Sequence, residues 1–128
     1  MKIENIKFKA KRLDDNSWVF GYFYEENGNT YIIENRQKES GLNRNLTYQV
    51  DPSTVCQFTG LTDENGVEIY ENDIVKIYDW EEVICNVEYK DYGFCLCDKH
   101  FRSGMMPLGV TLGNCYIYVV GNKFDKDK

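Results

Sequence analysis

The sequence predicts a mainly β protein, and three observations support that class. Its 128 residues include nineteen aromatic residues but only one alanine and seven leucines. Aromatic and β-branched residues suit a pleated, half-buried surface, whereas alanine and leucine favour helices. Short runs of alternating apolar and polar residues recur along the chain with turn-forming residues between them, and no helical period extends over three turns. Mainly antiparallel β structure is therefore expected.

Residues 6–34 predict an antiparallel meander of three strands. Residues 6–11 alternate apolar residues with lysines, which is typical of a strand with one solvent-facing side. Residues 14–16 have turn chemistry, residues 17–24 form the returning strand, and Asn27-Gly28 predicts a tight hairpin turn into a strand over 30–34. The alternation places four aromatic residues on one face of the second strand: Trp18, Phe20, Tyr22 and Tyr24. The meander is expected to belong to an N-terminal region covering residues 1–54.

The rest of the chain predicts a second β region. A polar stretch at 35–45 is expected to form a loop, and residues 99–113, with one proline and three glycines, a second one. Strands are predicted at 46–50, 55–61, 74–78, 82–89, 94–98 and 115–120. This pattern indicates a small SH3-like barrel over residues 55–122, followed by a solvated charged tail at 123–128.

Charge and hydropathy limit the classes of function. The formal charge of −6 argues against broad binding to a phosphate backbone. No run of residues is apolar enough to span a bilayer, and the first ten residues lack the apolar core of a signal peptide. We therefore expect neither a membrane protein nor a secreted one.

Five cysteines in so short a chain raise the question of a metal site. Their odd number favours reduced thiols over a disulfide framework. Cys95 and Cys97 share one face of a predicted strand and His100 follows, so that a further cysteine (Cys85 or Cys115) could complete four zinc ligands. A regular strand does not supply the short knuckle that structural zinc usually binds, whereas free cysteine behaves as a small apolar residue. We therefore predict core thiols, with no metal and no cofactor.

Catalytic motifs are lacking from the sequence. His100 is the single histidine, it lies in a predicted loop, and no nucleophile elbow or glycine-rich phosphate loop occurs. The acidic stretch 62–73 departs from a calcium-binding loop, because Val67 stands where an oxygen ligand is required. We interpret it as a polar turn and predict that the protein is not an enzyme.

A row of lysines offers one candidate for nucleic-acid binding. Lys7, Lys9 and Lys11 precede Arg12 and lie close in sequence to the aromatic strand 17–24. Lysines beside outward-facing aromatic rings would form a stacking platform for single-stranded nucleic acid. The simpler interpretation is the solvent-facing side of a strand, where lysine also discourages edge pairing. The acidic balance of the chain favours that simpler interpretation.

One long run of residues resembles a known family. Residues 50–76 read VDPSTVCQFTGLTDENGVEIYENDIVK, which resembles the core motif of the YopX family, approximately V-x-P-x-T-V-x-Q-[YF]-T-G-L-x-D-x-N-G-x-x-I-[YF]-E-G-D-I-V. Residues 8–10 resemble the family's opening F-R-A-W, and residues 118–122 its closing V-I-G-N. Lys11 stands where the opening usually has tryptophan, Asn72 where the motif has glycine, and the usual acidic C-terminal extension is missing. Asparagine tolerates the left-handed conformation, so the turn at residue 72 is expected to persist.

The resemblance implies a small, mainly β protein encoded by a bacteriophage or prophage, in a family with no established activity and no catalytic residues to carry over. Its motif consists of turn formers and β-branched residues, which indicates a role in the fold. Asn65-Gly66 is expected to provide turn geometry, Asp73 to brace the next turn, and Gln57 and Thr59 to hydrogen-bond the backbone. The complete set of expected structural positions is Gln57, Thr59, Gly60, Asp63, Asn65, Gly66, Asp73, Gly121 and Asn122.

The sequence thus favours a non-catalytic binding module in the cytoplasm of a bacterial host. Its expected partner is a protein of host or phage origin or a second copy of the chain, because exposed strand edges and apolar patches attract partners. The alternatives are a single-stranded nucleic-acid-binding accessory protein and a zinc-stabilised or metal-dependent enzyme domain.

Overall fold

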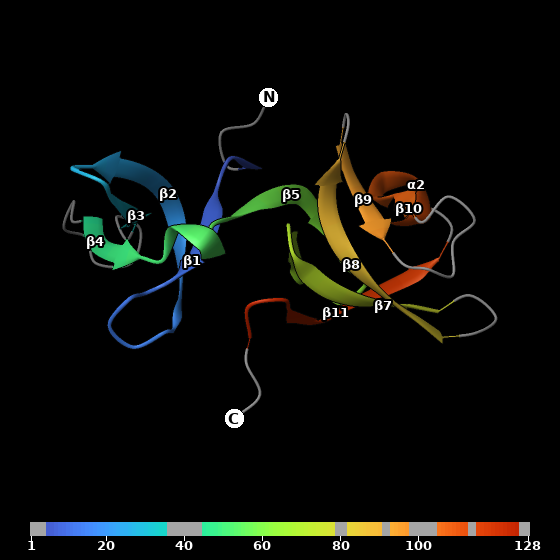
Figure 1. The fold of residues 1–128 in the computed structure, drawn as a ribbon. Coiled ribbons are helices and arrows are strands. Elements are labelled where there is room, and N and C mark those ends of the chain that lie inside the picture. Colours follow the sequence, from blue (N-terminus) through green and yellow to red (C-terminus); the bar gives the residue numbers. More distant parts are fainter. Residues whose placement is uncertain are drawn as a thin grey trace. The chain divides into compact units, whose positions relative to one another are not determined.

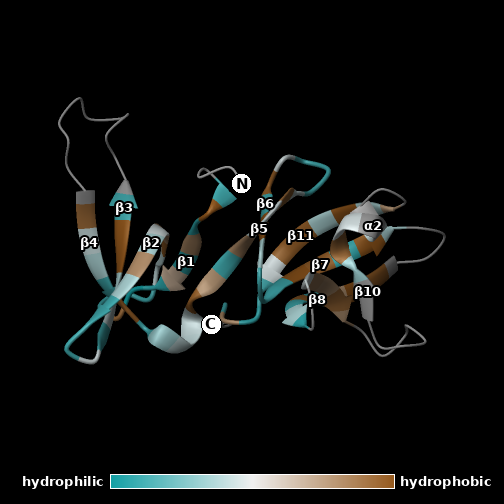
Figure 2. Ribbon diagram, turned by 90° about the horizontal axis from the view of Figure 1, so that it is seen from above, coloured by the Kyte–Doolittle hydropathy of each residue, from teal (hydrophilic) through white to brown (hydrophobic). Residues whose placement is uncertain are grey.

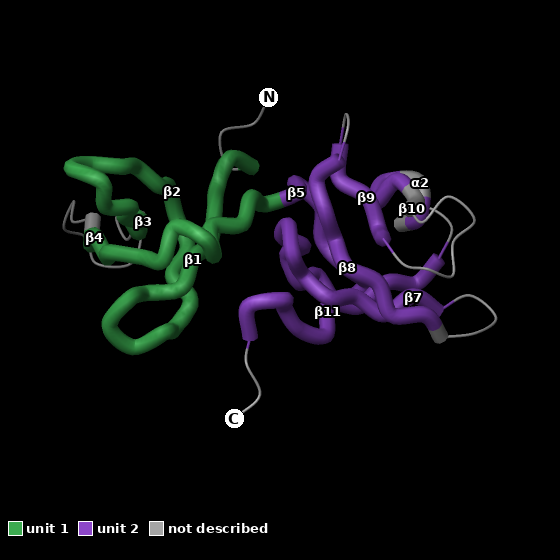
Figure 3. Tube along the Cα trace, viewed as in Figure 1, with its two compact units in different colours: residues 1–58 green, residues 59–128 purple. Residues whose placement is uncertain are grey.

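The structure is a computed structural model that describes residues 5–35, 45–78, 82–90, 93–97, 105–112 and 115–125, and it is mainly β as predicted (Figure 1). The chain divides into two compact units, residues 1–58 and residues 59–128 (Figure 3). It passes from one unit to the other within strand β5 (Cys56–Thr62). Each unit has a cluster of buried apolar residues of its own.

The first unit contains an antiparallel sheet built around β1 (Phe8–Lys11). Strand β1 pairs on one side with β2 (Trp18–Glu26) and on the other with the first residues of β5. Strands β3 (Asn29–Asn35) and β4 (Asn45–Val50) follow beyond β2. The end of β4 returns to the end of β1, where Arg12 forms an isolated bridge with Val50 and Asp51 N–H donates to the Lys11 carbonyl oxygen. A 3-10 turn, η2 (Pro52–Thr54), then leads into β5. The predicted meander is confirmed.

Two local features fix the register of this sheet. Asn27 and Gly28 both have positive φ, 53° and 81°, which is the mirror-image turn that matches the twist of a two-residue hairpin. Gly21 lies in β2 against β3, where an added Cβ would overlap the backbone carbonyl of Ile33. Register pairs Tyr22 with Ile33 and Phe23 with Ile32, so Phe23 lies on the core face. The core cluster of this unit is Ala10, Val19, Ile32 and Val50, with Phe8, Tyr48 and Val55 packed against it.

The second unit contains an antiparallel five-stranded sheet. Its strand order is β10 (Met105–Pro107), β9 (Gly93–Cys97), β8 (Glu82–Lys90), β7 (Asp73–Tyr78) and β11 (Tyr116–Asn122). The end of β5 pairs with the short strand β6 (Glu68–Tyr70). Hydrophobic residues recur along β7 and β11 (Figure 2). The core cluster is Ile69, Val75, Ile77, Cys85, Val87, Leu96, Leu108 and Ile117.

The prediction of a loop over 99–113 is wrong for residues 105–112. Met105–Pro107 forms β10 against β9, and Leu108–Leu112 forms a one-turn helix, α2. Leu108 is buried in the core, and the Thr111 hydroxyl donates to the Pro107 carbonyl oxygen (2.8 Å). Glycine and proline marked this stretch as irregular, but burial of Leu108 and Thr111 holds the short helix against the fold.

The second unit also differs from the barrel drawn from the strand pattern. Its described strands form no closed barrel, and the SH3-like barrel over 55–122 is not confirmed. The start of the expected solvated tail is bonded to the fold, because Lys123 N–H donates to the Asn72 carbonyl oxygen (2.8 Å). The Phe124 N–H similarly donates to the Asn122 side-chain oxygen (2.8 Å).

Candidate functional site

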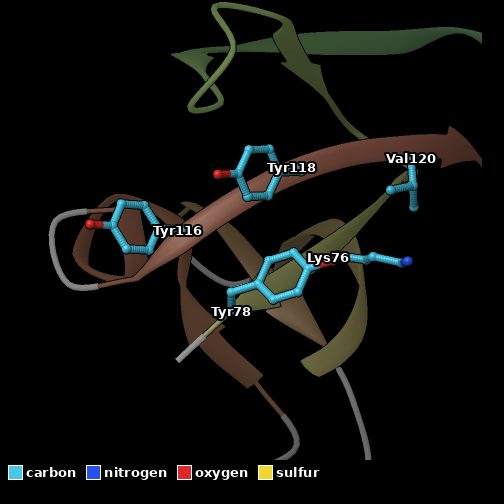
Figure 4. Close-up of a pocket in the computed structure, with 5 residues that line it drawn as sticks. All are labelled: Lys76, Tyr78, Tyr116, Tyr118 and Val120. Carbon is cyan, nitrogen blue, oxygen red and sulfur yellow. The ribbon is translucent and has the colours of Figure 1, made fainter. Parts of the chain in front are cut away.

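The outer face of β7 and β11 carries a cluster of exposed tyrosines, which we call the tyrosine cradle. It consists of Lys76 and Tyr78 from β7 and Tyr116, Tyr118 and Val120 from β11 (Figure 4). Antiparallel register places Tyr116 opposite Tyr78 and Tyr118 opposite Lys76. The alternate residues Val75, Ile77 and Ile117 point into the core. The same alternation that buries these residues therefore turns the tyrosines outward.

The cradle lines a shallow hollow of about 510 Å³ that is open to solvent. The Tyr78 and Tyr118 rings pack edge to face with centroids 5.6 Å apart, while Tyr116 is 63% exposed. On the next strand, Ile84 lies opposite Lys76 and is also exposed, which extends the apolar surface. Tyrosine is enriched at protein interfaces because its ring buries a large area and its hydroxyl can keep a polar partner. The cradle thus has the chemistry of a recognition surface.

The backbone edge of β11 is partly covered, although β11 ends the strand order of its sheet. The Val119 N–H donates to Asp63 Oδ2 (2.9 Å), and the Glu64 N–H donates to the Ile117 carbonyl oxygen (3.1 Å). Addition of a strand from another chain at these positions would have to replace both bonds. This edge therefore favours recognition through side chains over strand addition.

Asp63 and Asp73, both in the run that resembles the family motif, bond to backbone and side-chain donors. Asp63 Oδ1 accepts from the N–H groups of Asn65 and Val67, while its other oxygen holds β11. Asp73 is 1% exposed, and its two oxygens accept from the Tyr70 N–H and the Asn122 side-chain amide, each at 2.8 Å. These carboxylates are engaged in bracing β11 and the turns before β7.

The other motif positions lie in strand β5, at turns or at irregular backbone. The Thr59 hydroxyl donates to the Ile69 carbonyl oxygen (2.8 Å) and accepts from the Leu61 N–H, whereas the Gln57 side chain is exposed in β5. Gly60 and Gly66 have positive φ, and Asn72 adopts the left-handed conformation with φ of 69°. Gly121 lies where the register of β11 with β7 shifts. Asn65, in the turn before Gly66, donates its backbone N–H to Asp63.

Tyr70 is buried beside this network. Its hydroxyl donates to Glu68 Oε1 (3.1 Å), and burial, with a smaller contribution from the negative charge of Glu68, raises the pKa of Tyr70 above its usual value. The phenol therefore stays protonated in the neutral pH range. This is the arrangement of a structural hydrogen bond.

The cysteine pair predicted as a possible zinc ligand set does come together. The Cys95 and Cys97 sulfur atoms are 3.7 Å apart on β9, and the Cys95 thiol also donates to the Glu88 carbonyl oxygen. Burial, and then the hydrogen bond with Cys95, raises the pKa of Cys97 to about 12. His100 lies outside the described residues, and the part of the chain that the structure describes brings no three metal-ligating side chains together. All five cysteines are free thiols, and Cys85 belongs to the core.

The prediction that the lysine row of the first unit faces solvent is wrong. Lys9 and Lys11 are only 9% and 8% exposed, because β1 is paired on both sides and is not an edge strand. Their ammonium groups lie over the Trp18 ring, 4.6 and 4.7 Å from its centroid. Long lysine stems can be buried in this way along apolar surface.

Neighbouring aromatic residues of β2 face outward on the same side as these lysines. Register pairs Lys11 with Trp18 and Lys9 with Phe20, and Phe20 and Tyr22 are 46% and 39% exposed. Lys7 lies over the Phe58 ring with its ammonium 4.9 Å from the centroid. We call Lys7, Lys9, Lys11, Trp18, Phe20 and Tyr22 the aromatic–lysine face. The condition set by the sequence for a stacking platform, namely aromatic rings facing outward beside lysines, is met.

Sequence reasoning identified the aromatic–lysine face but missed the tyrosine cradle. The signal that could have found the cradle is the alternation within residues 74–78 and 115–120. In these segments Tyr78, Tyr116 and Tyr118 alternate with residues that point into the core. Alternation shows that these residues share faces, but strand pairing is needed to bring them onto one surface.

Fold and surfaces together define a two-unit antiparallel β protein with exposed aromatic faces. The described residues contain no helix long and apolar enough to cross a membrane. The chain belongs to the YopX family, since the family model described as YopX protein matches residues 7–127. Comparison with curated proteins and with solved structures found no match.

Proposed function

We propose that this chain is a non-catalytic interaction module, encoded by a phage or prophage, that binds a protein partner in the bacterial cytoplasm through its tyrosine cradle. The observation that carries the proposal is the open hollow lined by Tyr78, Tyr116 and Tyr118, with the exposed Ile84 beside it. Exposed apolar patches with polar rims mark interaction sites, and tyrosines are frequent energetic centres of interfaces.

The expected occupant is an extended segment of another protein. Three rings on two adjacent strands offer flat contact area, while the Lys76 side chain, also in the cradle lining, supplies a cation for an acidic side chain of the segment. Aromatic-lined grooves of small β domains bind extended segments in this manner. We retain as part of this proposal the prediction, made from strand spacing, that the second unit resembles an SH3 domain.

Support for a non-catalytic role comes from the buried acids. Asp63 and Asp73, which lie in the family motif, accept hydrogen bonds from structural donors. A catalytic carboxylate would instead face an open cleft that a substrate could enter.

The test compares capture of a partner from an extract of the bacterial host. The immobilised wild-type chain is expected to retain a defined protein, and the double variant Tyr116→Ser, Val120→Ser is expected to retain it about 30-fold more weakly, because loss of an interface centre costs about 2 kcal/mol. Tyr89→Ser is the matched control, since Tyr89 is similarly exposed in the same unit but lies outside the cradle.

Equal retention by the wild type and the cradle variant would contradict the proposal. Light scattering of the purified chain measures its oligomeric state and so tests whether a second copy of the chain occupies the cradle. A dimer that Tyr116→Ser dissociates would replace the heterologous partner with self-association.

A further inference from the structure

We propose that the aromatic–lysine face of the first unit binds single-stranded nucleic acid. This inference goes beyond the proposed function, because it concerns the other unit and a different class of ligand. It depends on the position of the rings, the position of the lysines and the distribution of charge.

The rings form a row along β2. Trp18, Phe20 and Tyr22 occupy every second position, which places them about 7 Å apart on one side of the strand. Beyond them, Tyr24 stacks on Tyr31 of β3 with ring centroids 5.1 Å apart. Phe20 and Tyr22 together present two exposed rings side by side. Unpaired bases stack on such rings with little dependence on sequence.

The lysines lie on the neighbouring strand, on the same side of the sheet. Contacts with Trp18 and Phe58 hold the three ammonium groups at this face, each within 5 Å of a ring centroid. Three positive charges are thereby placed one strand away from the exposed rings. An oligonucleotide that stacks on Phe20 and Tyr22 would have its phosphates attracted to that strand.

The charge of the chain is unevenly divided between its units. Residues 1–58 contain eight lysines and arginines and eight acidic residues, whereas residues 59–128 contain seven and thirteen. The whole excess of six negative charges therefore belongs to the second unit. The net charge of the chain, which argued against nucleic acid from the sequence, does not describe the unit that carries this face.

A single strand fits this surface better than a duplex or an acidic peptide. Bases in a duplex are stacked on each other and are not available to Phe20 and Tyr22. An acidic peptide would supply negative charge but no planar bases. The combination of exposed rings and fixed cations is therefore best matched by unpaired DNA or RNA.

Fluorescence anisotropy with labelled 20-nucleotide oligo(dT) and oligo(U) tests the proposal on the full chain. Saturable binding is expected at 50 mM salt, with a dissociation constant below the roughly 100 µM that is the weak limit of typical non-specific binding at physiological salt. Lys7 is the least buried of the three lysines. One phosphate neutralised there gives a salt slope of about −0.7 for a single strand, so affinity should fall at least about 2.5-fold between 50 and 200 mM salt. The variant Lys7→Gln should reduce that slope by about 0.7.

Two phenylalanines of β2 provide a matched pair of variants. Phe20→Ala removes a ring from the aromatic–lysine face, whereas Phe23→Ala removes a ring of similar exposure, 44%, from the opposite face of the same strand. Phe20→Ala should weaken binding at least fivefold, as expected for the loss of one stacked base, and Phe23→Ala should not. Circular dichroism of both variants verifies that the sheet is intact.

Any one of several results would overturn the inference: no saturable binding at 50 mM salt, equal effects of the two phenylalanine variants, or displacement by poly-glutamate as effective as by unlabelled oligo(dT). A duplex that binds as tightly as the single strand would also reject it. None of these outcomes depends on the tyrosine cradle, so failure here leaves the proposed function to its own test.

Discussion

The buried carboxylate of Asp73 should be the most sensitive single position in the second unit. Its two oxygens accept from the Tyr70 N–H and from the Asn122 side-chain amide, each at 2.8 Å, and the side chain is almost completely buried. In Asp73→Ala both donors lose this acceptor. A buried donor without a partner costs about 1–3 kcal/mol, so the loss of the acceptor for both donors should lower the unfolding free energy by about 2–6 kcal/mol. That is a large fraction of the stability of an ordinary domain.

An exchange of the two side chains gives this prediction its control. In the double variant Asp73→Asn, Asn122→Asp, the amide introduced at position 73 can donate to the carboxylate introduced at position 122. The new amide oxygen can still accept from the Tyr70 N–H, and the new carboxylate can still accept from the Phe124 N–H, which now bonds the Asn122 oxygen (2.8 Å). Either single substitution loses a bond that the double restores.

Urea unfolding followed by circular dichroism measures all four proteins of this cycle. We expect the double variant to be more stable than both single variants and to lie within about 1 kcal/mol of the wild type, as expected where hydrogen bonds are retained. A loss below about 1 kcal/mol in Asp73→Ala would refute the reasoning. A double variant no better than Asp73→Asn alone would show that the contact with Asn122 contributes nothing.

Three further changes probe single contacts. Gly21→Ala should disrupt the pairing of β2 with β3, because its Cβ would overlap the Ile33 carbonyl oxygen. Thermal unfolding should show a loss of more than about 1 kcal/mol, as expected where the native backbone excludes a side chain. Asn27→Ala, at φ of 53°, should cost about 1–2 kcal/mol by the same measurement, since alanine tolerates the left-handed region poorly. The pKa of Cys97 is about 12 in the fold and about 8.5 in an unfolded chain, so the unfolded state binds fewer protons above pH 8.5. The free energy of unfolding should therefore fall between pH 8.5 and pH 12, and it should fall less in Cys97→Ser. An unchanged alkaline dependence in that variant would reject the assignment.

Local chemistry predicted the parts of the fold that depend on a few adjacent residues. Asn27-Gly28 specified a two-residue turn because only residues that tolerate positive φ adopt it readily, and the structure has that turn. Asparagine at position 72 similarly holds the left-handed conformation expected of it. Such features need no information about distant segments.

The lysines of β1 show why a face could be predicted but not its environment. Alternation correctly separated Lys9 and Lys11 from Ala10, but it could not reveal that β1 pairs with both β2 and β5. Central position in the sheet and the ring of Trp18 bury the lysine stems, which composition alone would leave in water. The same limit hid the tyrosine cradle, because it is assembled from strands about forty residues apart in sequence.

The residues of the family motif and the candidate binding surfaces have different roles in this structure. Asp63 and Asp73 hold β11 in place through Val119 and Asn122, so the motif and the closing segment of the chain meet in one hydrogen-bonded network. Tyr116 and Phe20 make no part of that network and present their rings outward. Substitutions in the network should therefore lower the stability of the fold, and with it every activity, whereas substitutions of exposed rings should affect one ligand at a time. This difference is why the two proposed binding functions are tested at the exposed faces and not at the motif.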